Sequence, residues 1–272
     1  MQLPPGLASL SERLSQIGFE RTRRALAGLA LSIFVSLYLL VSLNAPDGFG
    51  RVFLALSASY AVAFVGVVAE WFWGRWFATG LAWSGVMIAV AAMVILGWEP
   101  QLAIFGGMHL LVILSLMGKK MAARYDFQEA WRTRYKMDEF GVARLQKAVT
   151  SAAAALPSLI ITALAPKEDG LTALGGLAAT LLVLAGLRGL TRVRSWGVLA
   201  IGGAGAMLGG TMAVSSLFGI GYDPMRALAM AEHPSVLTPV FGMVGAPLAF
   251  VFLAAAVVPF ARDIARFLRR PV

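Results

Sequence analysis

FATGLAWSGVMIAVAAMVIL, residues 77–96, is a run of 20 residues without a charged side chain. As a helix rising 1.5 Å per residue, it would span about 30 Å, which is the thickness of the hydrocarbon core of a bilayer. Seven further apolar runs flank it, and the chain is 59% hydrophobic and only 14% charged. The sequence therefore predicts an all-α, polytopic integral membrane protein with about eight transmembrane helices. The eight predicted spans are Ala25 to Leu43, Val52 to Trp73, Phe77 to Leu96, Gln101 to Met117, Val149 to Ala165, Leu171 to Leu187, Trp196 to Phe218 and Leu237 to Phe260.

The positions of the basic residues predict how these spans are oriented. Of the 23 Lys and Arg residues, all but Arg51, Lys167 and Arg226 fall in loops and tails on one side of the predicted membrane. Cytoplasmic loops retain Lys and Arg, so both chain ends are predicted inside, N-in and C-in. The single asparagine, Asn44, and the excess of Arg over Lys are typical of a GC-rich bacterial genome. We therefore expect a multi-pass protein of the bacterial inner (cytoplasmic) membrane.

This topology divides the chain into five segments. The first contains Leu7, Leu10, Leu14 and Ile17 at helical spacing, which predicts an amphipathic helix along the membrane surface. A frayed basic tail is the alternative for that segment. The predicted segments are the cytoplasmic amphipathic N-terminal segment 1–24, transmembrane helices 1–4 in 25–117, the basic cytoplasmic loop 118–148, transmembrane helices 5–8 in 149–260 and the basic cytoplasmic tail 261–272.

The spacing of the spans suggests an internal duplication. Adding 120 to the residue numbers of the first three spans brings them close to the fifth, sixth and seventh, and superposes Trp76 on Trp196 and Gly85 on Gly205. Each half would hold four spans and start inside, which gives two parallel four-helix repeats. The alternative is that similar hairpins arise from similar composition.

Several kinds of chemistry lack the residues that they need. The chain has no cysteine, no lysine within a predicted span to carry retinal, and only His109 as an intramembrane imidazole, since His233 lies in the last external loop. No H-E-x-x-H, G-x-S-x-G or P-loop motif occurs. We therefore expect no metal, no cofactor and no enzyme activity. The net charge of +9 comes without a nucleic-acid-binding motif, so nucleic acid is not an expected partner.

His109 is the first candidate for a functional position in the membrane interior. A neutral imidazole there needs a hydrogen-bond partner, and the candidates are the hydroxyls of Tyr60 on the second span and Ser84 on the third. One interpretation is a pathway for protons or substrate. The other is an interhelical hydrogen bond that holds the bundle together.

Glu70 is the second candidate, because it is the one carboxylate inside an apolar run. We expect it near the inner end of the second span, paired with Arg75. It either snorkels among its aromatic neighbours or acts as an acid that faces a pathway.

Small residues and prolines mark the packing of the later spans. Gly205 and Gly209 form a small-x-x-x-small pair that lets a helix approach closely, within this chain or from another subunit. Pro157 and Pro247 are candidate kinks. An oligomer or a larger membrane complex is therefore an open expectation.

The loop 118–148 is the largest polar segment, with eight basic and four acidic residues. Asp126 is expected to cap a helix, and Asp138 or Gly141 to end or restart it. The apolar stripe of that helix would cover the lipid headgroups or a protein partner. The residues expected to dock on anionic lipid or on a partner are Trp131, Arg132, Arg134 and Lys136.

The leading functional hypothesis is a non-catalytic membrane subunit or scaffold. It would pack with other membrane helices and dock a soluble partner or anionic lipid on its basic cytoplasmic face. The alternative is a small transporter or channel for an apolar or lipid-like substrate, with a polar site near His109. An intramembrane enzyme is the third hypothesis.

Overall fold

The computed structural model of the protein describes residues 19–45, 48–165, 170–217 and 244–268. All regular elements of the described residues are helices, which confirms the predicted all-α class. Several predictions lie outside the described residues: most of the amphipathic segment 1–24, the loop 222–236 with His233, and the first residues of the eighth span.

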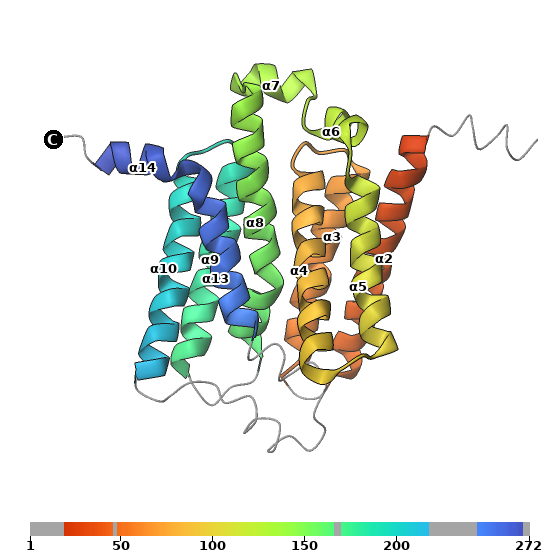
Figure 1. The fold of residues 1–272 in the computed structure, drawn as a ribbon, viewed down its shortest axis with the longest axis vertical. Helices are drawn as coiled ribbons and strands as arrows, with labels where there is room; N and C mark the ends of the chain where they lie inside the picture. Colours follow the sequence, from red (N-terminus) through yellow and green to blue (C-terminus); the bar gives the residue numbers. More distant parts are fainter. Residues whose placement is uncertain (1–18, 46–47, 166–169, 218–243, 269–272) are drawn as a thin grey trace, which may run out of the picture.

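The first half of the chain forms a ring of four helices. α2 packs on α3 and α5, and α4 packs on the same two helices (Figure 1). The buried side chains of this ring come from apolar positions on each helix, as expected where a bundle excludes lipid from its centre. The bounds of these helices are α2 Phe19–Asn44, α3 Gly50–Val68, α4 Gly74–Leu96 and α5 Pro100–Leu116.

The second half repeats the same pattern of neighbours. α8 packs on α9 and α13, and α10 packs on the same two helices (Figure 1). A short 3-10 turn, η2, and the helix α14 then run away from α13 at the end of the bundle where α2 begins. The bounds are α8 Glu139–Leu164, α9 Gly170–Thr191, α10 Trp196–Leu217, α13 Ala246–Val257, η2 Val258–Phe260 and α14 Ala261–Leu268.

The number of membrane-spanning helices agrees with the prediction of about eight. Seven described helices are individually long and apolar enough to cross a bilayer, and α5, of 17 residues, makes up to eight. α5 is followed after a bend of 76° by α6, Lys119–Tyr125. The bend falls at Gly118, whose φ of 103° is readily adopted only by glycine. The chain is a multi-pass membrane protein.

We call the end of the bundle that carries α6 and α14 the basic end. The described chain both enters and leaves the bundle at this end (Figure 1), as an even number of crossings requires. α7, Glu129–Tyr135, follows α6 here, and α8 then starts at Glu139, well before the predicted start of its apolar run. Asp138 caps α8 by accepting a hydrogen bond from Gly141 N at 2.7 Å, which confirms that it restarts the helix.

The two hairpins α3–α4 and α9–α10 are built alike, but at an offset of 123 residues and not the predicted 120. Glu70 and Val193 both adopt left-handed backbone, with φ of 55° and 54°. Trp196 therefore matches Trp73, and the predicted match with Trp76 is wrong at this turn. Three backbone hydrogen bonds of the first turn recur in the second. Glu70 N to Val67 O corresponds to Val193 N to Leu190 O, Trp71 N to Gly66 O corresponds to Arg194 N to Gly189 O, and Gly74 N to Trp71 O corresponds to Gly197 N to Arg194 O.

Glycines allow the helices of each hairpin to touch. A Cβ at Gly66 would lie 2.9 Å from Gly74 Cα, and a Cβ at Gly189 would lie 2.8 Å from Gly197 Cα. Real Cβ atoms do not come so close to backbone, so both hairpins need glycine at these positions. The shared G-x6-W-G spacing is the sequence signal of this contact.

The two halves meet where α3 and α4 pack on α8. A Cβ at Gly80 of α4 would lie 2.2 Å from the carbonyl oxygen of Thr150, and Ala153 packs beside it. Small residues therefore let α4 and α8 approach closely, as they do in membrane bundles generally. This leaves α8 in the centre of the protein with a fully buried alanine-rich stretch, residues 152–155.

Candidate functional site

His109 and Tyr60 form a polar contact in the interior of the first helix ring. Tyr60 Oη lies 2.7 Å from His109 Nε2, and His109 Nδ1 lies 2.8 Å from the carbonyl oxygen of Phe105. Since that carbonyl can only accept, the arrangement has Nδ1 donating to it and the Tyr60 hydroxyl donating to Nε2. Both nitrogens of the predicted intramembrane histidine are hydrogen-bonded.

The surroundings of His109 are closely packed. Its ring centroid lies 4.0 Å from that of Phe34 and 4.4 Å from that of Phe105, and its side chain is fully buried. On the α4 side, a Cβ at Gly85 would lie 2.2 Å from the ring. This geometry favours the interhelical hydrogen bond over the pathway. Ser84, the other predicted partner, is buried, and its hydroxyl has no hydrogen-bond partner among the described residues.

The basic end contains a buried ion pair that the sequence analysis missed. Arg75, at the start of α4, holds the carboxylate of Asp126 with two nitrogens, one of which is Nε at 3.0 Å from Oδ1. The indole Nε1 of Trp76 donates to the same Oδ1 at 2.7 Å. Only 8% of Arg75 and 2% of Asp126 is exposed. A two-nitrogen contact of this kind is the strongest pairing available to a guanidinium.

Two opposing effects act on the pKa of the Asp126 carboxyl. Burial raises its pKa above the ordinary value, while the hydrogen bonds and charge of Arg75 and the indole of Trp76 act in the opposite direction. Asp126 was predicted to cap the start of a helix. It instead ends α6 and points into the protein, because the bend at Gly118 turns α6 toward the start of α4.

Arginines also cap the end of α5. Arg75 Nη1 donates to the carbonyl oxygen of Leu116 at 3.2 Å, and Arg23 donates to the carbonyl oxygens of Leu114 and Met117. The last carbonyls of a helix have no partner within the helix and carry partial negative charge. The two cations therefore stabilise the sharp break between α5 and α6.

Glu70 does not pair with Arg75, and that prediction is wrong. α3 ends at Val68, so Glu70 lies in the turn before α4 and not within the span. Its carboxylate pairs with Arg124 at 2.7 Å and with Arg24. The left-handed backbone at Glu70 directs the side chain toward α2 and α6, while Arg75 faces Asp126.

α6 and α7 form a folded cap over the start of α4, which we call the cap, residues 119–135. Tyr125 Oη donates to the carbonyl oxygen of Val67 at 2.7 Å, and Gln128 Nε2 donates to that of Glu70 at 2.9 Å. The ring of Trp131 stacks on Phe72 at 4.3 Å. Trp131 of the predicted apolar stripe is therefore covered by this protein itself, while Phe127 is exposed.

The cap separates the predicted docking residues into two groups. Trp131 is 7% exposed and belongs to the core, so it is not part of the outer surface as expected. Arg134 and Lys136 are exposed and Arg132 is half-buried. These three cations lie on α7 or directly after it, beside a shallow groove of about 610 Å³ lined by Phe127, Glu129, Arg132, Thr133, Lys136, Met137 and Asp138.

Gly205 and Gly209 lie against α13 of the same chain. A Cβ at Gly209 would lie 2.9 Å from the ring of Phe250, and one at Gly205 would lie 3.6 Å from Leu253 Cβ. The predicted small-residue pair therefore serves packing within this chain. Pro157 lies inside α8, and Pro247 lies in the first turn of α13.

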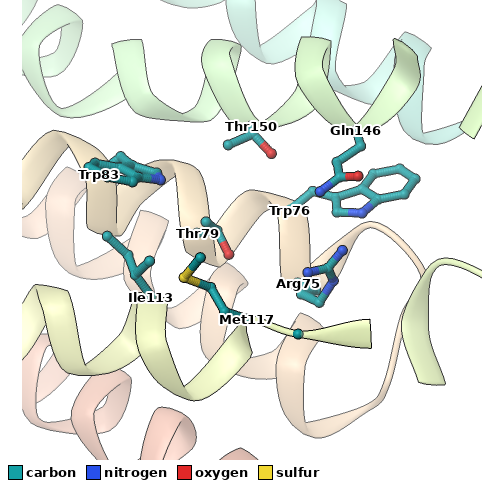
Figure 2. Close-up of a pocket in the computed structure, with 9 residues that line it drawn as sticks. Arg75, Trp76, Thr79, Trp83, Ile113, Met117, Gln146 and Thr150 are labelled. Atoms are coloured by element: carbon teal, nitrogen blue, oxygen red, sulfur yellow. The ribbon is translucent and has the colours of Figure 1, made fainter. Parts of the chain in front are cut away.

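A cavity of about 290 Å³ lies next to the ion pair, between α4, the end of α5 and α8 (Figure 2). Arg75 points into it from the start of α4, and Gln146 and Thr150 face it from α8. In liquid water this volume would hold about ten molecules. The residues that line it are Arg75, Trp76, Thr79, Trp83, Ile113, Met117, Gly118, Gln146 and Thr150.

The sequence held a signal for the missed pair. Arg75 stands alone between Trp73 and Trp76 in an aromatic boundary, and a cation buried there requires a carboxylate. Besides Glu70, the carboxylates of the 118–148 loop lay on that side of the predicted membrane. Among the described residues, no group of three or more His, Asp or Glu side chains could hold a metal ion.

Comparison with protein-family models, with curated proteins and with solved structures found no match.

Proposed function

We propose that this protein is a non-catalytic, multi-pass subunit of the bacterial inner membrane that docks a soluble protein partner through the outer face of its cap. The observation that carries the proposal is the attachment of the cap. The buried Arg75–Asp126 pair and the Trp131–Phe72 stack hold it on the bundle, and its exposed cations face outward.

Two features support docking of a protein on this surface. First, a surface that is already ordered loses less conformational entropy on binding than a flexible loop does. Second, the groove beside α7 combines Arg132 and Lys136 with the half-exposed ring of Phe127, over which the Arg132 guanidinium lies at 5.3 Å. Aromatic and arginine side chains are enriched where proteins bind each other. A partner with an acidic surface fits this composition.

The packing around His109 supports a structural role for the membrane interior. Its ring is enclosed by aromatic residues and both nitrogens are hydrogen-bonded. We therefore propose that the Tyr60–His109 contact holds the first helix ring together.

We also propose that the basic end of the bundle faces the cytoplasm, because cytoplasmic loops retain Lys and Arg.

The test is a pull-down from native membranes that compares two charge-reversed variants of the protein. In the cap variant, Arg134→Glu with Lys136→Glu reverses the charge of two exposed cations, one on α7 and one directly after it. Arg192→Glu with Arg194→Glu makes the same change in charge on the α9–α10 turn, whose two arginines are also exposed. We expect a co-purified protein that photo-crosslinks through position 134, and we expect its recovery to fall in the cap variant only.

Three results would contradict the proposal. The first is a purified protein with no crosslinked partner at residues 118–148. The second is equal loss of the partner in both variants, which indicates non-specific attraction to the basic end. The third is crosslinking of position 134 to phospholipid alone, which would assign the cap to anionic headgroups.

A further inference from the structure

The cavity between α4, α5 and α8 has a graded lining that the proposed docking function does not use. Along α4 the cavity is lined by Trp76 and by three residues that lie four positions apart on one face of the helix, Arg75, Thr79 and Trp83. They change from charged to hydroxyl to aromatic over eight residues, or about 12 Å of helical rise. The cavity is therefore polar at the basic end and apolar toward the middle of the bundle.

The other two walls differ in polarity. α8 contributes Gln146 and Thr150, and α5 contributes Ile113, which lies near Trp83, while Met117 follows α5 at the basic end (Figure 2). Trp83 is 41% exposed, so the cavity reaches the outer surface of the bundle beside it. Because Trp83 lies on α4, which is long and apolar enough to cross a bilayer, this side of the cavity faces lipid.

The dimensions fit a molecule that stands in one leaflet. The headgroup layer adds about 5 to 7 Å on each side of the hydrocarbon core. A depth of about 12 Å therefore crosses that layer and enters the hydrocarbon. A phospholipid standing here would place its phosphate among Arg75, Gln146 and Thr150 and its chains along Trp83 and Ile113.

The charge at the polar end also fits a phosphate. The guanidinium of Arg75 carries five N–H groups, and its bonds to Asp126 and Leu116 use three of them. Asp126 balances the charge of Arg75, and Arg23 adds a further positive charge at the same bend, next to Gly118 of the lining. A single phosphate would be met by guanidinium, amide and hydroxyl donors.

We propose that this cavity is a binding site for one phospholipid of the leaflet at the basic end, with the phosphate held by Arg75, Gln146 and Thr150. The site is separate from the outer face of the cap, so it does not depend on the docking function. A lipid here would fill the space where α5 and α8 both border α4, and so join the two halves of the protein.

The test is native mass spectrometry of the whole purified protein in detergent, titrated with phosphatidylglycerol. We expect one lipid to be retained at low concentration. In Gln146→Leu with Thr150→Val, which removes two of the donors, the affinity should fall roughly tenfold, as expected for lost hydrogen bonds to a charged group. Thr79→Trp, which fills the cavity, should abolish retention. Thr191→Val, which removes a hydroxyl at the basic end of α9, should retain the lipid as the unchanged protein does.

Two ligand controls separate a phospholipid from its parts. Diacylglycerol has the chains without the phosphate, and glycerol 3-phosphate has the phosphate without the chains. We expect neither to bind as tightly as phosphatidylglycerol or to displace it at equal concentration. Equal binding of either compound would overturn the proposal, in favour of a simple apolar groove or a simple anion site.

Unchanged lipid retention in both cavity variants would also overturn it, as would the absence of a retained lipid in the unchanged protein. Thermal unfolding in detergent shows whether each variant is folded. Because the two cavity variants act by different means, removal of donors and filling of space, one remains informative if the other does not fold.

Discussion

The hairpins α3–α4 and α9–α10 have the same backbone turn and almost none of the same chemistry. Both place a left-handed residue between the helices and both bring glycines into contact. At the equivalent positions, however, Glu70 of the first hairpin corresponds to Val193, and Arg75 corresponds to Val198. The glycines and the turn are therefore what the fold requires. The ion pairs of Glu70 and Arg75, and the cap and cavity beside them, lie at the first hairpin.

The largest expected difference between the hairpins concerns Arg75. We expect Arg75→Leu or Asp126→Leu to destabilise the protein by about 3 to 5 kcal/mol, because each leaves a buried charge without its partner. The double variant should lose clearly less than the sum of the two, since it leaves no unpaired charge. Unfolding in detergent measures all three values.

One control sharpens this prediction. Lys120→Ala removes an exposed cation whose Nζ lies 3.7 Å from the carboxylate of Glu20. We expect little change from this variant. If the loss of unfolding free energy in the double variant equals the sum of the two single losses, Arg75 and Asp126 are not coupled. The two hairpins would then differ in sequence at these positions but not in the stability that the pair provides.

The next largest effect should be equal in both hairpins. A Cβ at Gly74 would lie 2.2 Å from the carbonyl oxygen of Gly66, and one at Gly197 would lie 2.7 Å from that of Gly186. Gly74→Ala and Gly197→Ala should each cost about 1 to 3 kcal/mol, because the neighbouring helix must move away. The measurement is again unfolding in detergent.

Gly210→Ala is the matched control, since a Cβ there meets nothing within 4 Å. It should be neutral or slightly stabilising, because alanine has the higher helix propensity. If Gly74→Ala is costly and Gly197→Ala is not, the two hairpins are not equivalent and the offset of 123 residues loses its support.

The smallest effect should differ between the two hairpins. Val193 adopts the left-handed conformation, which costs most residues roughly 1 to 2 kcal/mol and glycine almost nothing. We expect Val193→Gly to stabilise the protein by about 1 kcal/mol. Glu70→Gly gains the same relief but loses the contacts with Arg24 and Arg124, so it should not stabilise. Stabilisation by both variants would show that the Glu70 ion pairs contribute nothing.

The predicted features differ in how local their causes are. The apolar runs, the restart of α8 at Asp138 and a hydroxyl partner for His109 were all predictable. Each depends on residues close in sequence, or on the scarcity of polar groups in the membrane. The partners of Glu70 and Arg75 were assigned wrongly, because the choice depends on the backbone conformation of the α3–α4 turn and on the direction that α6 takes after Gly118.

By itself, the sequence determined that this chain folds as a bundle of membrane-spanning helices with one basic end. The reason is that lipid offers no hydrogen bonds, so each apolar run must satisfy its own backbone and charges must stay outside. Only the tertiary structure decided that Asp126 of the cap pairs with Arg75, that Trp131 is buried and that a cavity opens beside Arg75. These depend on how the helices rotate and how closely they approach one another. Glycine contacts such as Gly80 on Thr150 set that approach across long distances in the chain.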